Sequence, residues 1–224
     1  MGCVEYREAL ALQMRLREQV IDGGPEVLLL LEHPLVYTLG RRSTPADLPM
    51  GREWYEGQGF DIVDVERGGK LTHHGPGQLV GYPIVRVERI PEYIQALEAA
   101  LVDALAQEGI ESRGRDHEGA QFTGVWAGER KIASIGVHLS HGVSMHGFAL
   151  NVDNDLQPFE WAVACGMPDT RMTSVLKETG RTGLMPCMRK RVAYAICRAL
   201  GRRQRIVTPY SRRLDPSARH ALSG

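Results

Sequence analysis

A glycine-rich run over residues 67–80 constrains this chain more than any other segment. It reads Arg-Gly-Gly-Lys-Leu-Thr-His-His-Gly-Pro-Gly-Gln-Leu-Val, and an apolar stretch continues from it to Val85. Every glycine adds backbone entropy to the unfolded chain, so a segment ordered only for packing would contain few of them. The run is therefore either a strand–turn–strand connection, for which Gly-Gly and Gly-Pro are ordinary signals, or a main chain that passes close to a ligand.

The composition indicates a chain that can bury a full hydrophobic core. Its 224 residues are 43% apolar, enough for one large domain or two small ones. Lys plus Arg and Asp plus Glu are balanced at 27 each, so no overall field would attract nucleic acid or an anionic membrane. The C-terminal quarter is locally basic from Arg189 to Arg213. That pattern indicates either a solvated helix face and tail or a docking patch for an acidic protein.

Four cysteines are scattered along the chain, at Cys3, Cys165, Cys187 and Cys197. Their spacing fits neither a metal site nor a disulfide framework. The N-terminal stretch is charged and amphipathic, unlike a signal peptide, and no apolar run reaches the length of a membrane span. We therefore expect a protein of the reducing cytoplasm, with no bound metal.

Hydrophobic periodicity predicts an α+β fold with a mixed or antiparallel central sheet flanked by helices. The order of elements lacks strict strand–helix–strand alternation, which argues against a parallel sheet. Helices are predicted over residues 5–20, 91–108 and 185–200, with a short one over 158–164. Strands are predicted over residues 27–31, 36–39, 61–65, 110–113, 125–126, 132–138 and 143–151, and a loop over 41–59.

The glycine-rich run resembles the signature of the lipoyl(octanoyl) transferases, which use octanoyl-acyl carrier protein in lipoate synthesis. That signature is Arg-Gly-Gly-x-x-Thr-(aromatic or His)-His-Gly-Pro-Gly-Gln-x-Val-x-Tyr, and every fixed position is met from Arg67 to Tyr82. Residues 134–136 and 147–151 match two further family segments. The resemblance spans residues 27–180 or so. It implies the fold of lipoate and biotin protein ligase catalytic domains, in a single catalytic domain over residues 1–224.

The resemblance also implies a catalytic pair, Cys165 and Lys131. Cys165 stands where the family has its acyl-accepting cysteine, and Lys131 matches the pattern Gly-x-x-Lys-Ile-Ala-x-Ile-Gly. Taken alone, such a cysteine is an ordinary core residue, such a lysine is ordinarily solvated, and Cys187 at a predicted helix start is a rival thiol. An ammonium about 4 Å from a thiolate attracts it by roughly 4 kcal/mol before desolvation, at an effective dielectric near 20. Such a pair would lower the pKa of the thiol.

An acyl-binding site is implied by the same matching segments. Small residues there would leave room for a straight eight-carbon chain, whose burial contributes on the order of 5 kcal/mol. Because neighbours in an extended segment point to opposite sides, the adjacent His73 and His74 are poor joint metal ligands. His74 takes the family's fixed position, where it would orient the substrate carbonyl or the incoming amine. The implied residues are Arg67, Gly68, Gly69, Lys70, Leu71, Thr72, His73, His74, Ser134, Ile135, Gly136, Gly147, Phe148 and Ala149.

The implied reaction moves an octanoyl group from octanoyl-acyl carrier protein to a lysine of a lipoyl domain, through a thioester on Cys165. The acceptors would be the lipoyl domains of 2-oxoacid dehydrogenases and the glycine cleavage H protein. No cofactor is implied, because thioester exchange is nearly isoenergetic and aminolysis of a thioester runs downhill. Two alternatives remain: an ATP-dependent lipoate or biotin protein ligase, in which Lys70 would contact a phosphate, and a non-catalytic acyl-binding module.

Overall fold

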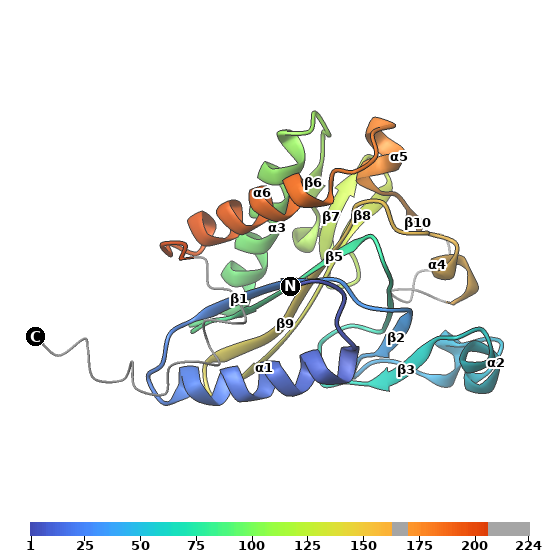
Figure 1. Cartoon of the computed structure of the whole chain (residues 1–224), viewed down its shortest axis with the longest axis horizontal. Coiled ribbons are helices and arrows are strands. Elements are labelled where there is room, and N and C mark those ends of the chain that lie inside the picture. The colour runs from blue at the N-terminus through green and yellow to red at the C-terminus, as the bar shows by residue number, and fades with distance from the viewer. Residues whose placement is uncertain (163–169, 206–224) are drawn as a thin grey trace, which may run out of the picture.

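The structure is a computed structural model that describes residues 1–162 and 170–205. Its strands form two sheets (Figure 1). The larger sheet contains, in spatial order, β1 (Val27–Leu31), β5 (Gln78–Ile84), β9 (Val143–Asn151), β8 (Arg130–Ser140), β7 (Gly124–Ala127) and β6 (Arg113–Gly114). These neighbours are all antiparallel, while β10 (Arg171–Met172) pairs with β8 in parallel. The smaller sheet has the order β3 (Asp61–Asp64), β2 (Val36–Leu39), β4 (Leu71–His74).

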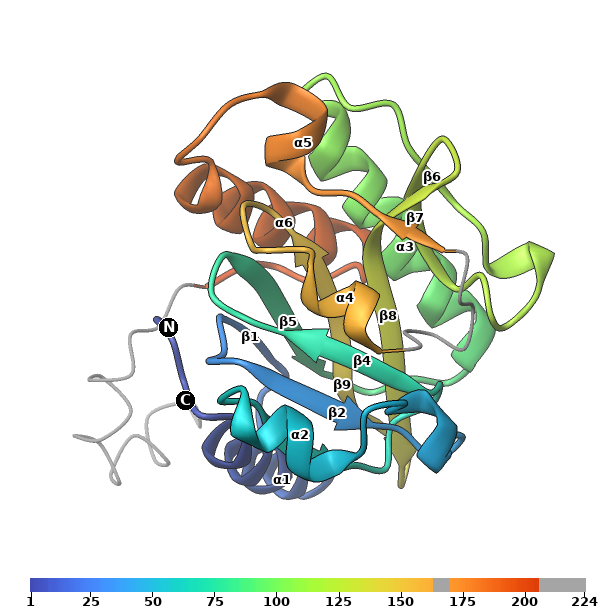
Figure 2. The same ribbon diagram turned by 90° about the vertical axis from the view of Figure 1, so that its right-hand side faces the viewer.

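Helices cover both faces of the larger sheet (Figures 1 and 2). α3 (Ile90–Ala106) and α6 (Met185–Ala199) pack on one face, and α1 (Tyr6–Ile21) packs on the other. Strand alternation divides β9 between them: Phe148 and Leu150 enter the core under α3 and α6, whereas Met145 and Ala149 face α1. The predicted α+β architecture with a central antiparallel sheet is confirmed. The remaining helices are α2 (Arg52–Gly57), α4 (Pro158–Trp161) and α5 (Val175–Thr179), with short 3-10 helices at Pro45–Asp47 and Asp116–Glu118.

Two element predictions are wrong. The predicted loop over 41–59 contains a 3-10 helix and α2; the first is stabilised by a capping box in which the Thr44 amide donates to Asp47 Oδ2 at 2.8 Å. The strand predicted over 110–113 begins only at Arg113, because Ile110 packs in the core beside α3. The predicted short helix over 158–164 ends at Trp161, and residues 163–164 lie outside the described part of the chain.

The basic residues of α6 are tied to the body of the protein. Arg189 pairs with Glu32 at 2.9 Å, and Arg191 pairs with the buried carboxylate of Glu108. Further along, Arg198 and Arg202 pair with acidic residues of α3 and of the segment before β1. These four arginines therefore help to dock the helix on the body of the protein, while Arg212 and Arg213 of the predicted basic tail lie outside the described residues. No helix in residues 1–162 and 170–205 is long and apolar enough to cross a membrane.

The glycine-rich run forms a strand–turn–strand connection and also a loop in the wall of a pocket. Residues 75–77 form the tight connection between β4 and β5, where Gly77 has φ +84° and a Cβ would lie 2.7 Å from the Asn154 amide nitrogen. Residues 67–70 form a separate loop that reaches the larger sheet, because the Gly68 amide donates to the Val137 carbonyl of β8 at 3.0 Å. The loop bridges the two sheets and closes one side of a pocket between them.

Candidate active site

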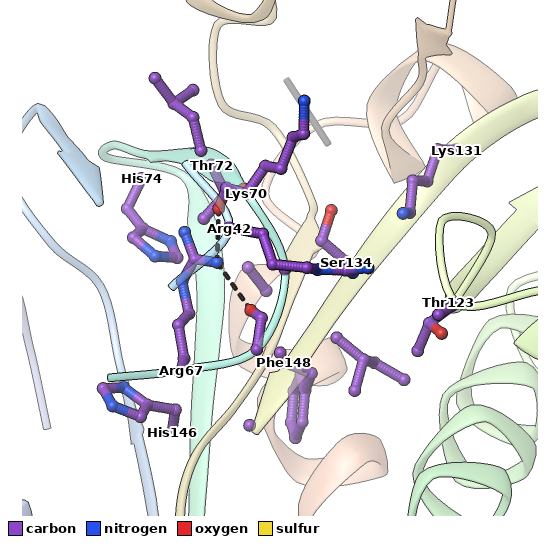
Figure 3. A pocket seen from close by; sticks show the side chains of 18 of the residues that line it. Arg42, Arg67, Lys70, Thr72, His74, Thr123, Lys131, Ser134, His146 and Phe148 are labelled. Atoms are coloured by element: carbon purple, nitrogen blue, oxygen red, sulfur yellow. Dashed lines mark hydrogen bonds between the residues drawn. The ribbon is translucent and has the colours of Figure 1, made fainter. Parts of the chain in front are cut away.

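A pocket lies between the two sheets, over the face of β8 and β9 that is not covered by α3 and α6 (Figure 3). Its empty space is about 630 Å³, a volume that includes the part open to solvent. The walls come from the loop 67–70, β4, β8, β9 and the segment 120–123. The predicted residues that line it are Arg67, Gly68, Gly69, Lys70, Leu71, Thr72, His74, Lys131, Ser134, Ile135, Gly136, Gly147, Phe148 and Ala149.

The structure does not bring His73 to this pocket. Along β4, the side chains of Thr72 and His74 face the pocket, and the ring of His73 points the other way. There it packs among Tyr37 and Phe159, with ring centroids 5.4 and 5.2 Å away. Burial lowers the pKa of His73 to about 4, so this side chain is a neutral part of an aromatic core.

Arg67 holds the pocket loop in shape. Its guanidinium donates to the Thr38 carbonyl and to the Thr38 hydroxyl, each at 2.7 Å. It also donates to the carbonyls of Gly68 and Lys70 at 3.0 and 2.7 Å (Figure 3). The residue is only 7% exposed. A permanent positive charge therefore lies buried at the wall of the pocket, where charges act more strongly than in water.

Two of the glycines expected to make room for an acyl chain make room for the backbone instead. A Cβ on Gly136 would lie 3.1 Å from the Gly68 carbonyl oxygen, so this glycine lets the loop 67–70 lie close against β8. A Cβ on Gly147 would lie 2.6 Å from Pro83 Cδ and closer still to the Gly81 carbonyl oxygen. Space for a ligand must come from the gap between the loop and the strands rather than from these two positions.

Lys131 is buried in the pocket wall, which excludes the interpretation as a solvated hairpin lysine. It is 2% exposed, and its Nζ lies 5.4 Å from the centre of the Trp126 ring, within the range of a cation–π contact. Its stem packs against Gly124, where an added Cβ would lie 2.7 Å from Lys131 Cε. The irregular pairing of β7 with β8 at Val125 and Trp126 accompanies this arrangement.

His74 presents one defined tautomer. The Gln78 amide nitrogen donates to Asn151 Oδ1 at 2.9 Å and to the His73 carbonyl at 3.2 Å, so its oxygen faces His74 Nδ1 at 2.7 Å. Nδ1 therefore carries the hydrogen, and Nε2 keeps its lone pair. Burial, and then the neighbouring His33, hold the pKa of His74 well below its ordinary value. His74 Nε2 is therefore a neutral hydrogen-bond acceptor.

Two tyrosines and a histidine that the sequence did not indicate as site residues also line the pocket. Tyr6 from α1 stacks on His74 with ring centroids 5.9 Å apart, and Tyr82 and His146 complete this wall. His33 Nδ1 faces the Val4 carbonyl at 2.6 Å and must donate, so Tyr82 donates to Nε2 at 2.7 Å. Burial lowers the pKa of His33 to about 4 and raises that of Tyr6 to about 12. This wall is thus polar but uncharged near neutral pH, apart from Arg67.

Cys165, the predicted nucleophile, falls in residues 163–169, outside the described residues. The three thiols within the described part of the chain, including the rival Cys187, do not line the pocket. Cys3 and Cys187 are exposed. Within residues 1–162 and 170–205, no group of three His, Cys, Asp or Glu side chains could hold a metal ion.

Comparison with known proteins places this geometry in a family. The profile described as lipoyl protein ligase A/B catalytic domain matches residues 5–197. The chain belongs to this family. The octanoyltransferase of Mycobacterium ulcerans is 44% identical over 212 residues, covering 89% of this chain and 86% of that protein. The octanoyltransferase of Dictyoglomus turgidum is 39% identical over 199 residues, covering 88% and 84%.

Solved structures share the fold. A lipoate-protein ligase A bound with ATP superposes with a TM-score of 0.70 at 16% identity, covering 90% of this chain and 87% of that one. A Thermoplasma acidophilum protein described as a putative lipoate protein ligase, with bound lipoic acid, gives 0.68 at 16% identity over the same shares of the two chains. At this level of identity the likeness concerns the fold alone.

Proposed function

We propose that this chain is an acyltransferase that moves an octanoyl group from octanoyl-acyl carrier protein to a lysine of a lipoyl domain, as a step of lipoate biosynthesis. The observation that carries the proposal is the gathering of Lys131, residues 67–72 and two further matching segments around one pocket. Relatives at 39–45% identity that bear the name octanoyltransferase support the same chemistry. The activity resides in a single catalytic domain.

The first half-reaction loads the enzyme. The Cys165 thiolate attacks the carbonyl carbon of the octanoyl thioester, a new C–S bond forms, and the carrier protein leaves as its thiolate, which takes up a proton. A nearby Lys131 ammonium would favour the ionised thiol, because opposite charges within about 4–6 Å stabilise each other's charged forms. Burial of the lysine supports this role, since the attraction between two charges rises as water is excluded.

The second half-reaction consumes the thioester. The ε-amine of the acceptor lysine attacks the carbonyl carbon of octanoyl-Cys165, and an amide C–N bond forms as the C–S bond breaks. The proton that the amine gives up balances the charge of the released Cys165 thiolate, which regains it to give the free thiol. His74 Nε2, a neutral acceptor, is suited to receive a hydrogen bond from the attacking amine. The octanoyl-acyl carrier protein and the lipoyl domains of 2-oxoacid dehydrogenases and glycine cleavage H protein are the proposed partners. Exposed free thiols at Cys3 and Cys187 suit a reducing cytoplasm.

An ATP-dependent lipoate or biotin protein ligase is the rival function on this fold. The names of the relatives at 39–45% identity favour the transferase over the ligase. The two differ in their energy source, since a ligase must activate a free acid. If the lipoyl domain gains an octanoyl-lysine amide from octanoyl-acyl carrier protein without ATP, the transferase is supported. If that amide forms only from free octanoate with ATP, the ligase is supported.

Intact-protein mass spectrometry tests the covalent route. The chain incubated with octanoyl-acyl carrier protein is expected to gain the mass of one octanoyl group. Cys165→Ser is expected to lose this gain, whereas Cys187→Ser, which removes an exposed thiol of α6, is expected to keep it. A wild-type chain that gains no mass, or a Cys165→Ser chain that still does, would contradict the scheme.

A further inference from the structure

Thr72 has a buried hydroxyl that lacks a hydrogen-bond partner in the part of the chain that the structure describes. The residue is 8% exposed, and no atom in residues 1–162 and 170–205 pairs with its Oγ1. Buried side-chain hydroxyls in folded proteins nearly always have a partner, so an exception needs an explanation. Among the buried side-chain atoms that lack a partner in the described residues, this hydroxyl is the one that belongs to a residue of the pocket wall.

The surroundings of Thr72 select the kind of partner it awaits. Thr38 lies directly opposite Thr72 across the β2–β4 ladder, which places their Cβ atoms about 4.5–5.5 Å apart. The Thr38 hydroxyl accepts N–H groups of Arg67 at 2.7 and 3.1 Å. A buried guanidinium therefore lies beside the Thr72 position, and its field favours an oxygen that carries negative charge over an ammonium group.

We propose that the Thr72 hydroxyl donates a hydrogen bond to the carbonyl oxygen of the bound acyl group. This inference rests on the proposed acyl transfer. When a nucleophile attacks a thioester carbonyl, its π electrons move onto the oxygen, which becomes an oxyanion in the tetrahedral intermediate. A hydroxyl donor and a nearby fixed cation stabilise that charge more than they stabilise the neutral carbonyl. The Thr72 proton stays on its oxygen throughout, and the electrons return when the leaving group departs.

Substitution at Thr72 separates this role from a structural one. Thr72→Val keeps the shape and removes the hydroxyl, and because that hydroxyl has no partner among residues 1–162 and 170–205, the urea unfolding midpoint should not fall. The turnover number for octanoyl transfer should fall about 10²–10³-fold, as for the loss of one oxyanion donor, with KM changed little. Thr72→Ser, which restores the donor, should recover turnover to within about tenfold of wild type.

Ser112 provides the matched control. Its hydroxyl is also buried without a partner in the described residues, but it does not line the pocket. Ser112→Ala should therefore leave both turnover and stability unchanged. If Thr72→Val keeps turnover within tenfold of wild type, or raises only KM, the inference is overturned while the proposed function stands. A wild-type chain that transfers no octanoyl group would overturn the proposed function itself.

Discussion

Lys131 is buried at a position that only a glycine neighbour allows. Gly124 begins β7 with φ +134°, and a Cβ there would lie 2.7 Å from Lys131 Cε and closer still to the Ala133 carbonyl oxygen. Real Cβ atoms do not approach other atoms so closely, so any side chain at this position must move the lysine or the β7–β8 pairing. The sequence places a glycine at residue 124 without indicating why, because the contact joins two strands.

Gly124→Ala is expected to destabilise the protein and to impair octanoyl transfer. Overpacking of this kind costs about 1–3 kcal/mol, in addition to the cost of a positive φ. Gly128→Ala is the matched control: Gly128 also has a positive φ, +57°, but no atom lies within 4 Å of an added Cβ. Urea unfolding and the rate of octanoyl loading measure the two effects. Equal losses of stability and rate in both variants would show that contact with Lys131 does not matter.

Some residues of the pocket can be predicted from the sequence and others cannot. The loop 67–72, Lys131 and the segments at 134 and 147 were indicated because each forms part of a contiguous pattern. Tyr6 and His146 were not indicated, because each is a single polar residue in an otherwise ordinary helix or strand. Only the packing of α1 against β9 brings them together, and the sequence of neither segment indicates this long-range contact.

At the scale of elements, helix α3 carries a carboxylate that organises the segment beside the pocket. Glu98 is 5% exposed and accepts backbone N–H groups of Gly124 at 2.8 Å, Asp116 at 3.1 Å and Arg115 at 3.3 Å. The segment between these amides supplies residues 120, 121 and 123 to the pocket wall. Burial raises the pKa of Glu98 although these N–H groups favour its ionised form.

Glu98→Gln is expected to lower the free energy of unfolding by about 1–3 kcal/mol, because its NH₂ group replaces an acceptor and leaves backbone donors unpaired. Octanoyl loading should slow as well, since Gly124 and the pocket wall lose their anchor. Glu92→Gln removes a carboxylate from the same helix at an exposed position, where it pairs with Arg89, and should change the free energy of unfolding by less than about 0.5 kcal/mol. Urea denaturation of both variants measures the difference. A Glu98→Gln protein as stable as Glu92→Gln would contradict this role of α3.

Periodicity predicted the long elements well because each buries a continuous face. The helices over residues 6–21, 90–106 and 185–199 repeat apolar side chains at helical spacing, and β9 alternates between two cores. Periodicity did not predict the short elements. α2 spans fewer than two turns and depends on Tyr55, which is fully buried against Tyr37 with ring centroids 5.3 Å apart. A contact between residues 37 and 55 is tertiary, and no local pattern could reveal it.

For the whole molecule, the buried histidines couple folding to pH. Burial lowers the pKa of His33 and His73 to about 4 and that of His146 to about 3, and it holds that of His74 well below the ordinary value. In the unfolded chain each would titrate near ~6.5. Below that pH the unfolded state binds protons that the folded state does not. The free energy of unfolding therefore falls as pH falls from about 6.5 toward 4, and each histidine adds up to ~1.4 kcal/mol per pH unit.

We expect the urea midpoint of unfolding to be nearly constant from pH 7 to 8 and to drop steeply between pH 6.5 and 4.5. His33→Gln should reduce the pH dependence of the free energy of unfolding by up to ~1.4 kcal/mol per pH unit, because one titrating group is removed while the pocket-lining side chains stay. His141→Gln, at an exposed position in the β8–β9 turn, should leave the slope unchanged. Because the buried histidines lie in two different clusters around β4, the dependence of stability on pH reflects the packing of both sheets. A slope that is the same in all three proteins would show that these rings do not stay neutral in the folded state.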